Sequence, residues 1–257
     1  MKKPLITVIM PAYNAKDYIV QAMDSVVRQT LAEGIELIVV DDCSTDQTVE
    51  TVRGYIEGFS EKKPLNRQIR FLQNASNAGV AQSRNLGIRN AQGAYVAFLD
   101  ADDWWETQKL EKQMQCIRET GTVLCATGRE LMRPDGTSLG KVIGIEQEVS
   151  YQKLLRTNSI PCSSVVLKTE VAREFYMCHD ELHEDYILWL KVLKKYGNAA
   201  GINEPLLKSR MSPGGKSRNK MKSAQMQYGV YRYMGIGRIR SLLLMCSYMV
   251  HGILKYL

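Results

Sequence analysis

The chain has 257 residues, of which 45% are hydrophobic, so it can bury one sizeable core in a single domain with a tail. Its formal charge of +7 is unevenly distributed, because ten Lys and Arg residues and no acid follow Glu204, which leaves 24 basic against 27 acidic residues before that point. The basic character therefore belongs to the tail, and the absence of a GxGxxG segment after the first apolar run and of any GxxxxGK[ST] loop leaves dinucleotide redox chemistry and P-loop hydrolysis without support.

Short apolar runs rich in β-branched residues alternate with helical patterns through the first half of the chain. We expect strands over residues 5–10, 35–40, 69–72, 95–99 and 123–127, each suited to burial on both faces. We expect helices between them, over residues 17–29, 47–56, 80–90 and 107–118. This alternation predicts an α/β fold with a doubly wound, mainly parallel sheet flanked by helices.

Acidic clusters follow two of these strands. Asp41 and Asp42 end the second strand, and Asp100, Asp102 and Asp103 follow the fourth. Because ligands bind outside the carboxyl ends of strands in such sheets, these clusters are expected to meet at one edge. Asp100 and Asp102 are suited to hold Mg²⁺ or Mn²⁺ and to leave positions for water and two phosphate oxygens, although a DxD sequence alone is also typical of a solvated turn.

Three other residues near this edge are candidates for ligand binding. Asp42 is suited to accept a hydrogen bond from a uracil imide or a ribose hydroxyl, with the aromatic face of Tyr13 nearby. Arg84 lies near the start of a helix whose small residues allow close approach, and it is expected to face the acidic edge. The sequence leaves open whether Arg84 contacts a diphosphate or pairs with Asp100.

The second half is less regular. A turn is expected at residues 134–136, a strand over 163–167, an amphipathic helix over 184–196, and a polar, glycine-rich loop over 212–217. Asp185, in the first turn of that helix, either stabilises the helix end or takes the proton of an acceptor hydroxyl. His179 and His183 have the spacing of a zinc pair, but no third ligand accompanies them.

The tail over residues 236–257 mixes cations with apolar residues and is too short an apolar run to cross a bilayer. Three alternatives are open for it: a helix packed on its own domain, a helix lying in a membrane interface, and a contact between two copies of the chain. No nucleic-acid-binding module is recognised. The six cysteines show no CxxC spacing and the N-terminus enters a strand pattern directly, so we expect the chain to stay in a reducing cytosol.

Five ordered motifs resemble those of glycosyltransferase family 2, the inverting enzymes with the GT-A fold, and the resemblance covers roughly residues 5–220. The motifs are Val8-Ile9-Met10-Pro11-Ala12-Tyr13-Asn14, Val39-Val40-Asp41-Asp42-Cys43-Ser44-Thr45-Asp46, Asn77-Ala78-Gly79 with Ser83-Arg84-Asn85, Phe98-Leu99-Asp100-Ala101-Asp102-Asp103, and Glu184-Asp185 followed by Trp189. The resemblance implies a GT-A domain over residues 1–220, with a nucleotide-sugar half over 1–105 and an acceptor half over 106–220. The remaining residues, 221–257, would form the helical tail.

The resemblance also implies roles for individual residues. Pro11, Tyr13 and Asp42 would cradle the nucleotide, Asp100 and Asp102 would form the metal-binding DxD element, and Asp185 would be the catalytic base. Asp103 would share or replace one of the metal roles. The implied reaction is a single in-line displacement in which the acceptor oxygen attacks the anomeric carbon as the metal-bound nucleoside diphosphate leaves.

The chain departs from its relatives in the late loop, where many of them place a histidine near the diphosphate. The segment Leu207-Lys208-Ser209-Arg210-Met211-Ser212 has none, so Arg210, Lys216 or Lys220 would serve the phosphates instead. The bacterial members imply a glycan or polyprenyl-diphosphate-linked acceptor and work at the inner face of the cell membrane, where the basic tail would attract anionic lipid. The rival interpretations are a sugar-phosphate nucleotidyltransferase and a catalytically silent nucleotide- or membrane-binding assembly partner.

Overall fold

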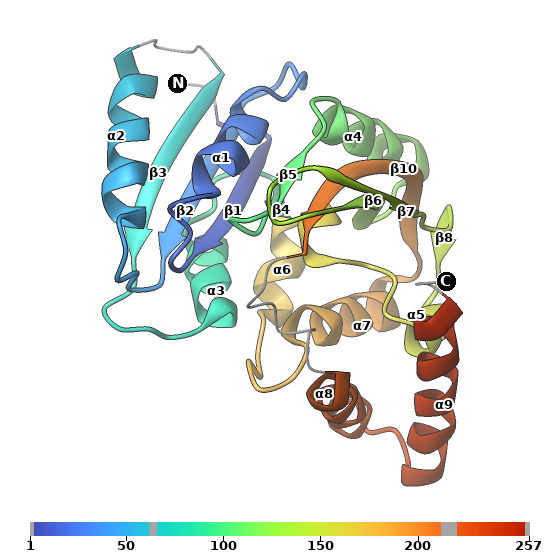
Figure 1. The fold of residues 1–257 in the computed structure, drawn as a ribbon. Coiled ribbons are helices and arrows are strands. Elements are labelled where there is room, and N and C mark those ends of the chain that lie inside the picture. Colours follow the sequence, from blue (N-terminus) through green and yellow to red (C-terminus); the bar gives the residue numbers. More distant parts are fainter. Residues whose placement is uncertain (1–2, 62–65, 212–219, 255–257) are drawn as a thin grey trace.

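A computed structural model describes residues 3–61, 66–211 and 220–254 of the chain. One twisted sheet runs through it with helices on both faces (Figure 1), as expected for an α/β fold. The strand order is β3-β2-β1-β4-β9-β6-β10-β5, with β7 paired to β6 and β8 paired to β10.

The first half of the sheet is parallel, as predicted. Its strands are β1 (Ile6–Ala12), β2 (Ile35–Asp41), β3 (Arg67–Gln73) and β4 (Tyr95–Phe98). The connecting helices are α1 (Ile19–Val27), α2 (Thr48–Glu61) and α3 (Val80–Asn90), the last with the predicted bounds. Because all four strands run the same way, the segments that follow β1, β2 and β4 emerge at one edge.

The second half of the sheet is mixed, because short antiparallel pairings are added there to the mainly parallel sheet that was predicted. Strand β9 (Val166–Lys168) lies antiparallel between β4 and β6 (Leu124–Met132), whereas β6 and β10 (Ala199–Arg210) are parallel. The other additions to this half are antiparallel pairings of β5 (Trp104–Trp105) and β8 (Glu148–Val149) with β10, and of β7 (Ser138–Ile143) with β6.

The strand expected over residues 163–167 is wrong in its first part. A 3-10 turn occupies Cys162–Ser164, and the strand starts only at Val166. The turn is held because the backbone N–H of Ser164 donates to the carbonyl of Pro161 and the carbonyl of Ser163 accepts from the Trp105 indole Nε1 at 2.7 Å. These contacts remove Ser163 from the ladder and bring it to the end of β4.

Helices cover the two faces of the sheet unequally. Apolar side chains of α1, α2 and α4 (Lys109–Thr120) pack on one face. The other face is covered by α3, α5 (Tyr151–Arg156), α6 (Thr169–Phe175) and α7 (Glu184–Tyr196), whose Trp189 packs against Phe98 of β4 at 5.9 Å between ring centroids. Beyond α7 lie α8 (Lys220–Tyr233) and α9 (Arg238–Leu254), on the side away from the sheet (Figure 1). Within the described ranges, no helix combines the length and apolar character needed to span a bilayer.

Candidate active site

A cavity of about 1040 Å³ opens at the carboxyl ends of β1, β2 and β4. The end of β10 and the start of α7 close its other side. Seven of the residues that the sequence singled out for binding or catalysis line this cavity: Pro11, Tyr13, Asp42, Arg84, Asp100, Asp102 and Asp185. Tyr13 is 52% exposed there, so its ring is available to a planar ligand.

Arg210 clamps the acidic loop that follows β4. Its backbone N–H donates to Asp103 Oδ1 at 2.9 Å, and its Nε donates to the carbonyl of Asp102 at 2.9 Å. The guanidinium lies between the rings of Tyr18 and Trp104, at 4.6 Å and 4.8 Å from their centroids. Its terminal nitrogens donate to the carbonyl of Pro134 and to Gln21. Arg210 therefore orients the DxD loop, a role that differs from the expected contact with phosphate; Lys216 lies outside the described residues.

Arg84 forms an ion pair with Asp100, which is one of the two alternatives that the sequence left open. Its Nη2 donates to Asp100 Oδ1 at 2.6 Å, and its Nη1 donates to Glu184 Oε1 at 2.8 Å. The side chains of Arg84 and Glu184 are only 4% and 7% exposed, whereas that of Asp100 is 38% exposed to the cavity. One buried guanidinium thus connects the end of β4 to the first turn of α7, where Asp185 is the next residue.

Asp42 organises the segment that leads into α3. Its Oδ1 accepts from Asn74 Nδ2 at 2.6 Å and from the backbone N–H of Ala78 at 2.8 Å, and its Oδ2 accepts from the backbone N–H of Gly79 at 2.9 Å. Asp42 is 5% exposed and lines the cavity. Since a carboxylate oxygen can accept two hydrogen bonds, Oδ2 retains the capacity to accept one more from a ligand.

Asp180 is a cavity residue that the sequence analysis did not single out. It lies in the loop before α7, and its Oδ1 accepts from the backbone N–H of Ala81 in the first turn of α3 at 3.0 Å. Gly79, with φ of +87°, passes so close that an added Cβ would overlap Asp180 Oδ2. In the sequence, Asp180 stands four residues before Glu184, which could have marked it as a candidate acid. No local pattern, however, indicates that this loop reaches α3.

The environment of Asp185 suits a base that works near neutral pH. Its side chain is partly exposed on the cavity wall, and its Oδ1 accepts from the backbone N–H of Tyr186 at 2.7 Å. Burial, followed by the charge of neighbouring Glu184, raises its pKa from 3.8 to about 6, against the opposing effects of Arg84 and His183. A carboxyl group in this range is ionised at pH 7 and still basic enough to take a proton from a hydroxyl.

The cavity carries an excess of acidic groups. Seven acidic side chains line it against three arginines: Asp42, Asp100, Asp102, Asp103, Asp180, Glu184 and Asp185 against Arg84, Arg129 and Arg210. Burial first, and then the charges of Asp102 and Asp100, raise the pKa of Asp103 well above its usual range. A diphosphate would be repelled by such a surface unless a cation accompanied it, so the donor set of Asp100 and Asp102 fits a hard divalent ion.

Two carboxylates alone are too few to enclose such an ion. In the part of the chain that is described, no three His, Cys, Asp or Glu side chains are grouped as metal ligands. His179 and His183 have separate partners, because His179 Nδ1 lies 2.6 Å from Glu181 and His183 Nε2 lies 3.4 Å from the carbonyl of Ser223. The oxygens of a bound diphosphate are the groups that would complete the coordination of a cation at Asp100 and Asp102.

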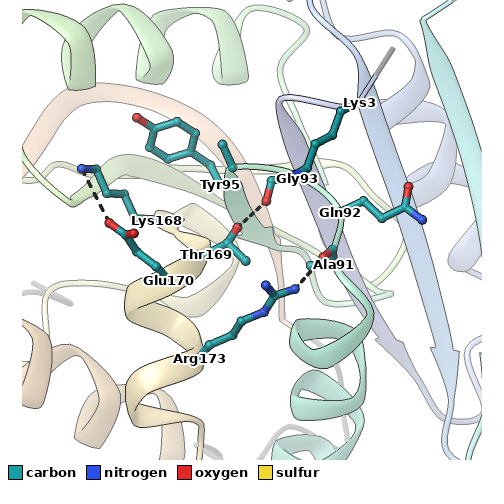
Figure 2. Close-up of a pocket in the computed structure, with 10 residues that line it drawn as sticks. Lys3, Ala91, Gln92, Gly93, Tyr95, Lys168, Thr169, Glu170 and Arg173 are labelled. Carbon is teal, nitrogen blue, oxygen red and sulfur yellow. Dashed lines mark hydrogen bonds and ion pairs between the residues drawn. The ribbon is translucent and has the colours of Figure 1, made fainter. Parts of the chain in front are cut away.

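A second cavity, of about 750 Å³, lies at the amino end of β4 and contains none of the predicted site residues (Figure 2). Polar groups that line it form hydrogen bonds with one another: Thr169 Oγ1 donates to the carbonyl of Gly93 at 2.7 Å, and Arg173 Nη2 donates to the carbonyl of Ala91 at 2.7 Å. These bonds fasten α6 to the loop that precedes β4. Its position away from the carboxyl ends of the parallel strands makes it the weaker candidate.

Comparison with known proteins agrees with this geometry. The model of the family described as "Glycosyl transferase family 2" matches residues 7–166. A Bacillus subtilis protein named as a teichuronic acid biosynthesis glycosyltransferase, TuaG, is 38% identical over 90% of this chain and 88% of its own length. The Escherichia coli UDP-Glc:alpha-D-GlcNAc-diphosphoundecaprenol beta-1,3-glucosyltransferase WfaP is 32% identical over 98% of this chain and 95% of its own.

Solved structures agree at the level of the fold. Residues 1–349 of Staphylococcus aureus TarS, in complex with UDP-GlcNAc, superpose with a TM-score of 0.71 at 20% identity, over 95% of this chain and 71% of that 1–349 chain. The Pyrobaculum calidifontis mannosyltransferase PcManGT, in complex with GDP-Man and Mn²⁺, has a TM-score of 0.68 at 19% identity, over 93% of this chain and 66% of its own.

Proposed function

This chain belongs to glycosyl transferase family 2 and is a glycosyltransferase with the GT-A fold, and from that premise we propose that it moves a sugar from a UDP-sugar to a hydroxyl of a lipid-linked saccharide, with inversion at the anomeric carbon. One observation supports this most strongly. The carboxyl ends of β2 and β4 and the first turn of α7 contribute acids to the same cavity, and Asp185 has a pKa of about 6 there. A base and a cation-binding pair that line the same cavity are what an in-line displacement needs.

Different residues of the cavity would bind the nucleotide-sugar donor and activate the acceptor. Pro11, Tyr13 and Asp42 line the part of the cavity next to β1 and β2 and would hold the nucleoside. Asp100 and Asp102 would hold Mn²⁺ or Mg²⁺, which supplies positive charge to the departing diphosphate. Asp185 would take the proton from the acceptor hydroxyl. This assignment corresponds to a nucleotide-sugar half over residues 1–105, an acceptor half over 106–220 and a tail over 221–257.

The acceptor and the location follow from the relatives. WfaP is named for a sugar acceptor carried on diphosphoundecaprenol, and TuaG for the synthesis of teichuronic acid. We infer that this chain likewise acts in cell-surface polysaccharide synthesis on a polyprenyl-diphosphate-linked saccharide. Because such an acceptor lies in a membrane and nucleotide sugars are made in the cytosol, the site would work at the inner face of the cell membrane.

Donor hydrolysis and transfer by the purified full chain test the proposal. UDP-, GDP- and dTDP-sugars are supplied with and without Mn²⁺ and a polyprenyl-diphosphate-linked saccharide, and release of the nucleoside diphosphate is followed. We expect release from one donor that requires the metal and is lost in Asp102→Ala. In Asp185→Ala we expect transfer to be lost while UDP and Mn²⁺ still raise the thermal midpoint. Asp17→Ala, an exposed acid on the loop before α1, is the matched control.

The opposite result is equally definite. If no donor is consumed with the acceptor present, and nucleotide with Mn²⁺ leaves the thermal midpoint unchanged, the transferase proposal fails. The chain would then be a catalytically silent assembly partner.

A further inference from the structure

Helix α9 is apolar on both of its faces. Its inner face packs on the rest of the protein: Ser241 is fully buried, and Leu244 and Met245 contact the core between the sheet and α7. Arg240 fastens this side further, since its Nη2 donates to Gln152 of α5 at 3.2 Å. The tail is therefore packed on its own domain along one face, which is the first of the three alternatives raised by the sequence.

The outer face of α9 carries a stripe of large exposed side chains. Ile239, Leu242, Leu243 and Met249 are 78%, 59%, 67% and 51% exposed. Their spacing of three, four, six and seven residues places them on one side of the helix, together with Cys246. A helix that is apolar on all sides is normally surrounded by protein or lipid. Four large apolar side chains exposed in one stripe form a patch of the kind that marks an interaction surface.

The positive charge of α8 and α9 indicates what kind of surface the exposed stripe of α9 would contact. The described side chains of α8 and α9 include the cations Lys222, Arg232, Arg238 and Arg240 and no carboxylate. Two copies meeting through this stripe would bring the positively charged helices of each toward those of the other without an acid between them. An anionic bilayer offers the missing negative charge and an apolar layer for the stripe at the same time.

The same helix borders the catalytic cavity. Tyr248, on a different side of α9 from the outer stripe, lines the cavity together with Ser223 of α8 and Asp185. A surface that receives the outer face of α9 would therefore lie one helix away from the acceptor side of the site.

We propose that Ile239, Leu242, Leu243 and Met249 dock the protein on the surface of an anionic lipid bilayer, with α9 lying in the interface. The docking surface deepens the proposed function, on which it rests for its biological purpose: it would bring the cavity to the depth at which a polyprenyl-linked acceptor presents its sugar. Binding itself depends on the apolar stripe and the cations and not on the transfer reaction.

Sedimentation of the full chain with vesicles tests this. The vesicles are phosphatidylcholine alone or phosphatidylcholine with phosphatidylglycerol, at low and high salt. We expect binding to the anionic vesicles that weakens in salt, and a loss of roughly tenfold or more in partitioning for Leu242→Glu/Leu243→Glu. The control is Leu139→Glu/Val142→Glu, which adds the same charge at two exposed apolar positions on β7, 41% and 56% exposed.

Each outcome decides the matter. Binding that survives the α9 substitutions, or that falls equally with the β7 substitutions, overturns the proposal. Wild-type protein that does not bind anionic vesicles at low salt also overturns the proposal. If that protein is a dimer and the α9 substitutions separate it into monomers, the stripe is a contact between two copies. UDP and Mn²⁺ binding, followed by thermal midpoint in the same samples, shows independently whether the active site is intact, so failure of docking and failure of the transferase proposal are distinguishable.

Discussion

Replacing Glu184 by glutamine should shift the pH dependence of sugar transfer to lower pH. The carboxyl of Asp185 has its pKa raised from 3.8 to about 6, a difference that corresponds to about 3 kcal/mol against its ionised form. Burial is the largest cause and the charge of Glu184 is the next. Glutamine keeps an oxygen for Arg84 Nη1 but removes the charge, so the ionised form of Asp185 becomes easier to reach.

The size of the effect can be read at one pH. A base must be ionised to act, so with a pKa of about 6 the wild-type enzyme should retain about a tenth of its plateau rate at pH 5. The Glu184→Gln variant should retain a clearly larger fraction, because its acid limb lies below that of the wild type. The assay is release of nucleoside diphosphate at saturating donor and acceptor, from pH about 4.5 to 8.

The matched control is Glu181→Gln, which removes a carboxylate from the loop just before α7, at a position where the side chain is 69% exposed. That variant should leave the acid limb unchanged, because solvent screens its charge. The reasoning is refuted if wild-type activity is flat through pH 6. It is equally refuted if the limb of Glu184→Gln stays in place or rises.

Three further predictions concern the metal, a backbone contact and a buried lysine. Asp102→Asn should abolish the rise in thermal midpoint given by UDP with Mn²⁺ and slow donor consumption about 100-fold; retention of the metal response would exclude Asp102 as a ligand. Gly79→Ala should cost about 1–3 kcal/mol in urea unfolding, because its φ is +87° and the new Cβ overlaps Asp180, and the cost should be smaller in an Asp180→Ala background. Burial lowers the pKa of Lys109 from 10.5 to about 7, so the folded state favours the neutral amine. The free energy of unfolding should therefore rise with pH from about 7 towards 10.5. Lys109→Met should remove this rise, and an identical slope in the variant would contradict the assignment.

The alternation of apolar runs and helical patterns was sufficient to predict the first half of the sheet. Buried parallel strands have continuous apolar sequences, and their carboxyl ends meet at one edge, so the order of these runs was enough to assign Asp42, Asp100 and Asp102 to one cavity. The second half was predicted less well. Short antiparallel strands such as β9 and β5 carry too few residues for a periodic signal, and their pairing depends on contacts such as the bond from Trp105 to Ser163.

The roles of the charged residues depended on tertiary structure. Arg84 meets Glu184 across 100 residues of sequence, and Arg210 meets Asp103 across 107. Both arginines were candidates for phosphate, yet the terminal nitrogens of both guanidinium groups bond to the protein itself. No local pattern reports such pairing, because it depends on how α7 and β10 are placed against β4.

The sequence by itself therefore determined the fold class, the edge of the sheet that carries the chemistry and the acids that gather there, because these depend on periodicity and on the direction of neighbouring strands. Only the tertiary structure decided that Asp180 holds α3, that Arg84 joins the DxD loop to the helix of Asp185, and that α9 buries one apolar face and exposes another. Each of these arises from the packing of side chains that are distant in sequence. The energy of such contacts exists only once the elements have been brought together.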